Sequence, residues 1–151
     1  MLESAKPSAE PDLSPFDAVA RLEPAELPMP ITATVTDSSG DPILTVTLSF
    51  SPGASEPPVV VADGDVDMDT VPLLHAALIT AVEGHTHVYC DLHRVTFFSA
   101  AGLNALVTAR VRAVEKGVRL EVRGAQGLTR RVLQLAGLEA LFAPSHSSES
   151  A

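Results

Sequence analysis

Apolar and polar residues alternate over several short segments of the chain, a pattern typical of β-strands with one buried face. The first two segments are β-branched, and the Asp, Ser, Gly and Pro residues between them predict a hairpin turn over 37–42. The third segment is short and uniformly apolar, as in a buried strand, and the last alternates strictly, as in an edge or half-buried strand. The predicted strands are 31–36, 43–50, 59–62, 87–92 and 118–123, with an apolar continuation into a turn at 95–98.

Three other segments repeat apolar residues every three or four positions, which predicts helices over about 71–84, 102–116 and 127–136. Asp69 or Thr70 supplies an N-cap for the first helix, and Gly117 a C-terminal stop for the second. The residues predicted to face inward are Val71, Leu74, Leu78 and Val82, then Leu103, Leu106, Val107, Val111 and Val114, then Leu128, Val132 and Leu135, with Leu138, Leu141 and Phe142 completing the core.

The order of these elements predicts an α/β fold, with one mixed sheet and helices packed mostly on one face. Residues 1–30 hold six of the twelve prolines and six acidic residues, so we expect a disordered acidic arm, with at most one loose turn at 17–22. Residues 143–151 read as a polar tail. The 151-residue chain therefore predicts one folded domain over 31–142.

Composition narrows the class of protein. There is no Trp and there are five Phe, so the core must be aliphatic, and the single Cys90 excludes an internal disulfide. The N-terminus does not resemble a signal peptide, and no apolar run approaches the roughly 20 residues that span a bilayer. These features predict a cytoplasmic protein that is not inserted in a membrane.

The net charge of −9 is distributed unevenly. Residues 1–30 contribute −4, residues 31–89 contribute −8 without any Lys or Arg, and residues 90–151 contribute +3. A chain this acidic is poorly suited to bind a phosphate backbone, so we expect no nucleic-acid partner. A protein partner with a basic patch suits it better.

The sequence offers no convincing set of metal ligands. The alternating acids of 63–69 fail the EF-hand pattern, because Met68 and Leu74 occupy the positions that require Gly and an acid. A second candidate cluster would split its ligands between the two faces of a strand; its members are His85, His87, Cys90 and His93. We therefore expect no metal and no cofactor.

Catalytic signatures are also missing from the sequence. Ser99 stands at a strand-to-helix turn but lacks the G-x-S-x-G elbow, so we expect it to be the N-cap of the second helix. Neither of the glycine-rich phosphate-binding patterns, G-x-x-x-x-G-K-S/T and G-x-G-x-x-G, occurs in the sequence. The sequence therefore predicts a protein that is not an enzyme.

Four segments in the same order resemble the STAS domains, best known as anti-sigma-factor antagonists. They are VYCDLHRVTFFSAAGLNALV at 88–107, Gly-Asp-Val-Asp at 64–67, Leu-Glu-Val-Arg-Gly-Ala at 120–125 and Thr-Arg-Arg-Val-Leu-Gln-Leu-Ala-Gly-Leu at 129–138. The resemblance spans about 31–142, with 51–58 as an apparent insertion. It implies a STAS-like mixed sheet flanked by three to four helices, which acts as a protein-binding module.

The resemblance also implies a partner and a docking surface. In the family, the antagonist binds an anti-sigma factor that is also a serine kinase, through the turn that enters the second helix and an earlier Asp. The kinase then phosphorylates a Ser in an Asp-Ser-Ser/Thr-Gly motif on that turn. The implied partner-binding residues here are Asp67, Ser99, Ala100, Ala101, Gly102 and Asn104.

This chain departs from the family motif. When the two are aligned on the glycine, the chain has Ser99-Ala100-Ala101-Gly102 where the family has Asp-Ser-Ser/Thr-Gly. Ala100 takes the position of the phosphorylated Ser and has no hydroxyl, so we expect no phosphorylation there. Ser99, one position earlier, is a weak substitute acceptor because its side chain would point differently from the turn. The first hypothesis is therefore a bacterial regulator that binds an anti-sigma factor without the usual phosphoswitch. The alternatives are a small-molecule or nucleotide sensor and a scaffold subunit of a larger assembly.

Overall fold

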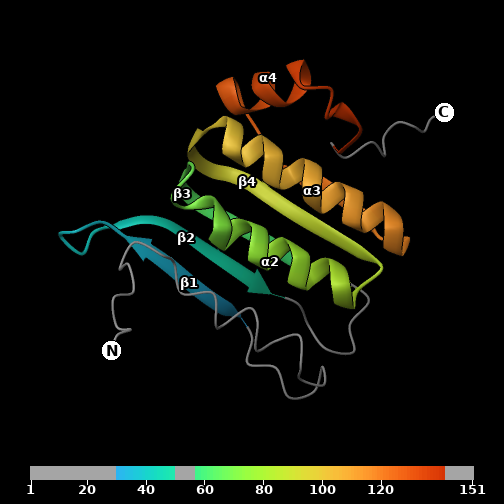
Figure 1. Ribbon diagram of the computed structural model, residues 1–151, viewed down its shortest axis with the longest axis horizontal. Helices are drawn as coiled ribbons and strands as arrows, with labels where there is room; N and C mark the ends of the chain where they lie inside the picture. Colours follow the sequence, from blue (N-terminus) through green and yellow to red (C-terminus); the bar gives the residue numbers. More distant parts are fainter. Residues whose placement is uncertain (1–29, 50–56, 142–151) are drawn as a thin grey trace, which may run out of the picture.

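The computed structural model describes residues 30–49 and 57–141. In chain order its elements are β1 (Ile31–Thr36), β2 (Pro42–Ser49), β3 (Val59–Val66), α2 (Val71–Gly84), β4 (His87–Phe98), α3 (Ala100–Lys116), β5 (Arg119–Arg123), α4 (Gly127–Leu135) and the 3-10 helix η3 (Glu139–Leu141). The strands form one sheet in the order β1-β2-β3-β4-β5. The first three are antiparallel and the last three parallel, which confirms the predicted α/β fold with a mixed sheet (Figure 1).

Several predictions fall outside the described residues. They are the N-terminal arm except Pro30, most of the loop at 51–58, the burial of Phe142, and the tail at 143–151.

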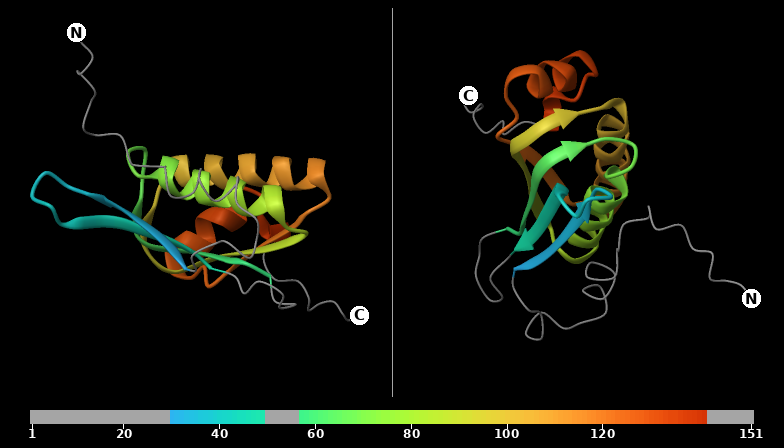
Figure 2. Two further views of the ribbon diagram at one scale, coloured as in Figure 1. Left: turned by 90° about the horizontal axis from the view of Figure 1, so that it is seen from below. Right: turned by 90° about the vertical axis from the view of Figure 1, so that its left-hand side faces the viewer.

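The core lies between the sheet and two helices. Helices α2 and α3 lie side by side over one face of the sheet. Helix α4 lies near the lateral edge of the sheet that β4 and β5 form (Figure 2). One row of paired residues crosses all five strands and is buried throughout: Ile31, Leu48, Val60, Cys90 and Val122. Each fully buried Leu or Val contributes about 1.5–3 kcal/mol by leaving water.

Two strands are longer than the sequence predicted. The predicted third strand ends at Ala62, but β3 continues through the acidic stretch to Val66. Strand β4 likewise runs without a break to Phe98, so that Val66 pairs with Phe98 at the end of the parallel ladder. Parallel pairing with a neighbour far along the chain holds this polar stretch extended. The composition of this stretch alone therefore does not predict that it is a strand.

The buried face of α3 differs from the predicted one. Val107, Val111 and Val114 were expected inside but are 42%, 53% and 68% exposed. The residues that face the core are instead Gly102, Ala105, Leu106, Ala109 and Ala113. Their spacing of three and four positions defines one face of the helix. Because four of the five are small, the helix backbone packs close to the sheet and to α2.

The C-terminal part of the fold also has a different inner face. Leu128 and Leu135 are each 76% exposed, against prediction, whereas Leu133 is fully buried. The predicted burial of Leu138 and Leu141 is confirmed. Strand β5 is an edge strand as expected, yet three consecutive residues, Leu120 to Val122, are buried.

Candidate functional site

The sequence-predicted site residues all lie near one end of the sheet. Parallel strands β3 and β4 both end there, and each leads directly into a helix. The Ser99 amide donates a hydrogen bond of 3.0 Å to the Val66 carbonyl, so the turn that precedes α3 is joined to the end of β3. The structure therefore brings Asp67 and the Ser99–Asn104 segment to the same region.

Asp67 organises the turn before α2. Its Oδ1 accepts hydrogen bonds from the amides of Asp69 (2.9 Å) and Thr70 (3.0 Å). The fully buried Thr70 hydroxyl donates to the Asp65 carbonyl at 2.8 Å and accepts from the Asp67 amide at 2.9 Å. Thr70 is the N-cap residue, but its own side chain makes no capping bond to the helix. The Asp67 carboxylate thus holds the turn that leads into α2 by accepting from the amides of its last two residues.

Ser99 is the N-cap of α3, as the sequence predicted. Its Oγ accepts from the Ala101 amide at 3.2 Å, and its carbonyl accepts from the amides of Gly102 and Leu103. The helix begins at Ala100, two residues earlier than expected. The Ala100 side chain is exposed and that of Ala101 is half-buried. The capping role occupies the Ser99 hydroxyl and leaves Ala100 as the outermost residue of this turn.

Gly102 is required by packing against Phe98. A Cβ at this position would lie 2.8 Å from two ring atoms of Phe98, closer than side-chain carbons approach one another. The Phe98 ring is itself largely buried at the end of β4. The glycine therefore lets the first turn of α3 close over the aromatic ring.

A shallow groove runs between the N-terminal parts of α2 and α3. It is lined by Val71, Pro72, His75, Ala101, Asn104, Ala105 and Thr108. Two of the sequence-predicted site residues, Ala101 and Asn104, belong to this lining. The lining contains no Asp, Glu, Lys or Arg. A charged side chain of a partner can therefore enter between the helices without meeting one of these residues with the same charge.

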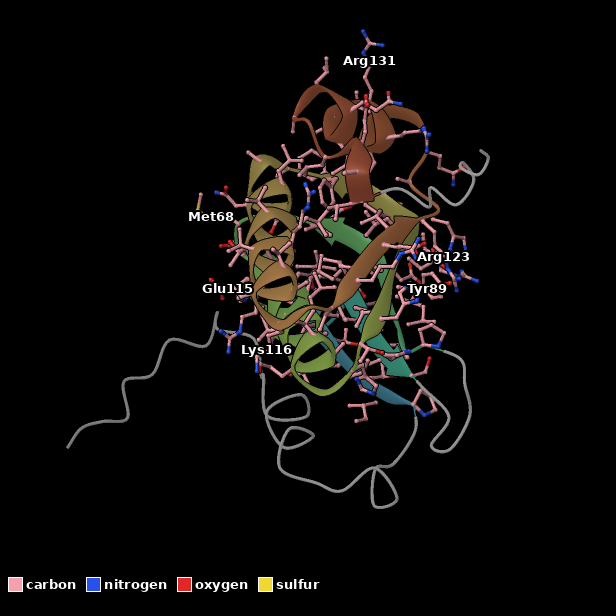
Figure 3. The ribbon with its side chains drawn as sticks, turned by 90° about the vertical axis from the view of Figure 1, so that its right-hand side faces the viewer. Met68, Tyr89, Glu115, Lys116, Arg123 and Arg131 are labelled. Atoms are coloured by element: carbon pink, nitrogen blue, oxygen red, sulfur yellow. The ribbon has the colours of Figure 1, made fainter. Side chains whose placement is uncertain are left out.

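Exposed apolar and acidic side chains gather where the parallel strands β3 and β4 end. Met68 is 78% exposed and its side chain points away from the fold (Figure 3), and Phe97 at the end of β4 is 52% exposed. Within the described part of the chain, the carboxylates of Asp63, Asp65, Asp67 and Asp69 form no ion pair with Lys or Arg. Thr96 donates to Asp65 at 2.6 Å, which ties β4 to β3 beside these acids. This end of the sheet thus carries unneutralised negative charge and two exposed apolar side chains, Met68 in the turn before α2 and Phe97 on the sheet face away from the helices.

The sequence reasoning missed Met68, Phe97 and His75. Met68 follows the predicted third strand and stands among acidic residues, so its position did not single it out as a contact residue. Phe97 belongs to the segment 95–98, which the sequence predicted to continue into a turn. The exposure of Phe97 follows from the strand register: Phe98 faces the core, so its neighbour Phe97 points to the opposite side.

Three side chains of types that often act as nucleophiles, bases or metal ligands are buried or paired with a carboxylate: Cys90, His87 and His93. Cys90 is fully buried, and burial raises the pKa of its thiol to about 12, so it is not an activated nucleophile. The His87 imidazole lies 2.9 Å from Glu121, and the His93 imidazole 2.6 Å from Asp91. Among the described residues, no group of three or more His, Cys, Asp or Glu is arranged to hold a metal ion.

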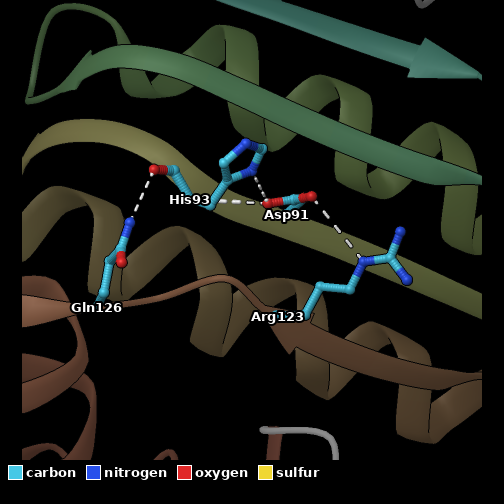
Figure 4. A network of polar contacts seen from close by, with 4 residues as sticks. All are labelled: Asp91, His93, Arg123 and Gln126. Carbon is cyan, nitrogen blue, oxygen red and sulfur yellow. Dashed lines mark hydrogen bonds and ion pairs between the residues drawn. The ribbon is translucent and has the colours of Figure 1, made fainter.

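The face of the sheet opposite α3 carries a polar network instead. Burial opposes ionisation of Asp91, but hydrogen bonds from the His93 amide and imidazole, together with the charge of Arg123, lower the pKa of its carboxyl below the usual value (Figure 4). Arg123 also stacks over Tyr89, with 4.3 Å from the guanidinium carbon to the ring centre (Figure 3). The Gln126 side chain donates to the His93 carbonyl at 3.2 Å and fixes the start of α4. These contacts join β4, β5 and α4.

None of the helices in the described part of the chain combines the length and apolarity needed to cross a bilayer. No curated protein matches the chain by sequence.

The solved structures that this chain resembles include anti-sigma factor antagonists. One from Mycobacterium paratuberculosis is 27% identical, with a TM-score of 0.54 over 72% of this chain and 88% of that one. The antagonist SpoIIAA in its unphosphorylated form is 19% identical, with a TM-score of 0.56 over 64% of this chain and 84% of that one. The Bacillus cell fate determinant SpoIIAA in its phosphorylated form is also 19% identical, with a TM-score of 0.53 over 64% and 87%.

The sequence model of the family described as "Mlab, STAS domain" matches residues 51–143, more than half of the chain. That match includes the turn before α2, the groove and the Ser99 cap. Together with the five-stranded mixed sheet and its helices, it shows that the chain belongs to the STAS domain family.

Proposed function

We propose that this protein is a non-enzymatic regulator that binds an anti-sigma factor of the serine-kinase type. The observation that carries the proposal is the region where β3 leads into α2, in which exposed Met68 precedes the groove between α2 and α3 and the carboxylates of Asp67 and Asp69 are unneutralised within the described chain. The printed descriptions of its structural neighbours, as anti-sigma factor antagonists, support the same class of partner. A bacterial cytoplasmic setting accords with that class.

The composition of the surface defines the partner's contact region. Exposed Met and aromatic side chains are frequent anchors in protein interfaces, because their burial removes large apolar areas from water. The neighbouring acids favour a partner with a basic rim, which also accelerates encounter. The contact region on the partner should therefore combine an apolar pocket with Lys or Arg at its edge.

The same surface supports binding without the usual phosphoswitch. Ala100, at the position where the family carries the phosphorylated Ser, is exposed but has no hydroxyl. Ser99 is engaged as a helix cap through its Oγ. Phosphate adds roughly −1.5 to −2 charges at neutral pH, so its absence removes the family's electrostatic means of releasing the partner. Control in this protein would then act through abundance, a second ligand or the parts of the chain outside the domain.

The test compares binding and phosphorylation in one pair of proteins. Wild-type chain captures its partner from host lysate, the partner is identified by mass spectrometry, and the purified pair is incubated with ATP. We expect binding and no phosphate on the wild-type chain, whereas Ala100→Ser, which restores the hydroxyl, becomes phosphorylated. Phosphate on wild-type Ser99 would contradict the unswitched mechanism. A captured partner of another protein class would contradict the proposed function itself.

A further inference from the structure

A second groove lies on another side of α3. It is lined by Val107, Arg110, Val111, Val114, Glu115 and Leu138. The three valines are the residues that were expected in the core and are exposed instead. They recur at intervals of four and three positions, so they form one apolar stripe along about two turns of helix. No described residue covers this stripe.

The charges of this groove are not balanced within the described chain. Glu115 is matched by Arg112, whose Nη1 lies 3.4 Å from its carboxylate. Arg110 forms no ion pair with any described residue. The groove is therefore an apolar strip that exposes one uncompensated positive charge, and it suits an apolar segment that carries acids.

The N-terminal part of the chain contains such a segment. Phe16, Val19 and Leu22 recur every three residues, which places them on one side of a helical turn, and Ser14-Pro15 is a typical helix start. The segment carries Asp17, Arg21 and Glu23, and Glu26 follows it, so residues 13–26 have a net charge of −2. Its apolar spacing and negative charge complement the valine stripe and Arg110.

The position of β1 brings this segment within reach. Ile31 pairs with Leu48, which pairs with Val60, so β1 begins near the end of the sheet where β4 and β5 start. Helix α3 ends at that same end, because β5 starts three residues after Lys116. Four strand spacings separate β1 from β5, about 19 Å in all, and the eight residues 23–30 extend up to about 27 Å.

We propose that residues 13–23 of this chain dock on the Val107–Val111–Val114 groove of their own domain. The acids of the segment distinguish this groove from the one between α2 and α3, which lies beside Asp67 and Asp69 and would repel them. The docked segment covers the apolar stripe and places carboxylates near Arg110. The contact is independent of the proposed regulator function, since it uses a different side of α3.

Disulfide trapping in the full-length chain tests this contact. Ala20→Cys is paired with Val114→Cys in the second groove, and in a matched chain with Asn104→Cys in the first. Ala20 leaves Phe16, Val19 and Leu22 intact. The native Cys90 does not interfere, because its thiol is fully buried. Mass spectrometry separates a disulfide within one chain from one between two chains.

We expect the Val114 pair to close within one chain at least about tenfold faster than the Asn104 pair, because docking raises the effective concentration of the two thiols. Adding Arg110→Glu to the Val114 pair should slow closure severalfold, and added salt should do the same in the wild-type background. Thermal unfolding of each reduced variant checks that the fold is kept. Equal rates for the two pairs, faster closure with Asn104, or disulfides only between chains would each overturn the proposal, the last in favour of a second copy on the groove.

Discussion

Gly64 holds the end of β3 in a conformation that no other residue adopts without strain. Its φ is +125°, and a Cβ built on it would lie 2.1 Å from the Ile43 carbonyl oxygen of the neighbouring strand. That oxygen belongs to backbone paired in the sheet, so it cannot move aside as a side chain can. Gly64 also directly precedes Asp65, whose carbonyl and carboxylate hold the turn before α2 and strand β4.

The cost of Gly64→Ala follows from two terms. Placing an L-residue at this φ costs about 1–3 kcal/mol. Forcing a methyl group against the backbone of β2 costs about another 1–3 kcal/mol. We therefore expect the free energy of unfolding to fall by about 2–6 kcal/mol, which at about 4 °C per kcal/mol for a domain of this size lowers Tm by about 8–24 °C.

Urea unfolding followed by circular dichroism measures this loss, and Gly84→Ala is the matched control. A Cβ at Gly84 meets nothing within 4 Å, and its φ is not in the left-handed region. The control should change stability by about 0 to +1 kcal/mol, because Ala favours the helix that ends there. A loss below about 1 kcal/mol for Gly64→Ala, or equal effects in the two variants, would refute the reasoning about the strained strand.

Three further predictions concern single side chains. Asp67→Ala should lower the free energy of unfolding by about 1 kcal/mol, because it loses the hydrogen bonds from the Asp69 and Thr70 amides. Asp69→Ala should change it by less than about 0.5 kcal/mol. Urea titration that ranks the two variants otherwise would contradict this role of Asp67. Cys90 should not react with a thiol reagent at pH 8 in the folded protein and should react on unfolding, since burial raises its pKa to about 12; stoichiometric labelling of the native state would disprove its burial. The lowered pKa of Asp91 means that the folded state favours the carboxylate, so this group stabilises the fold above the ordinary aspartate pKa near 4 and loses that effect as the pH falls through its lowered folded value. Asp91→Asn should therefore be less stable than wild type at pH 7, with the difference shrinking at acid pH, and a difference independent of pH would count against the network with His93.

Local rules were sufficient for the features that depend on neighbours in the sequence. The β-branched segments and the 37–42 turn predicted the hairpin of β1 and β2. Gly117 ends α3 in the left-handed conformation, and Ser99 caps its start. In each case the residue type satisfies a need of the backbone within two or three positions. The structure therefore confirms these predictions with shifts of one or two residues at the ends.

The rest depends on contacts between distant segments. The stretch from Asp63 to Val66 is polar enough to be a turn, but pairing with β4 holds it as strand. In α3 the more hydrophobic valines were assigned to the core, whereas the close approach of α2 and the sheet selects the smaller Ala105 and Ala109. Hydrophobicity alone does not encode the distance between packed elements.

The candidate site divides in the same way. The capping role of Ser99 was predicted from its position before a helix, whereas the cap of α2 was assigned to Asp69 or Thr70 and not to the Asp67 carboxylate. The exposure of Phe97 could not be predicted, because it depends on β4 continuing to Phe98, which turns Phe97 away from the core. The family resemblance predicted where the candidate surface lies, and the structure shows which apolar side chains are exposed at that end of the sheet.

The proposed function is tested most directly by the affinity of the captured anti-sigma factor for wild type and Ala100→Glu. Ala140→Glu is the matched control, since Ala140 is also exposed but lies on η3. Calorimetry should show binding to wild type and Ala140→Glu with similar Kd, and at least about tenfold weaker binding to Ala100→Glu, equivalent to about 1.4 kcal/mol. Equal affinity for all three proteins would contradict docking at the turn that enters α3, and failure of the wild-type chain to bind any anti-sigma factor would contradict the proposed function.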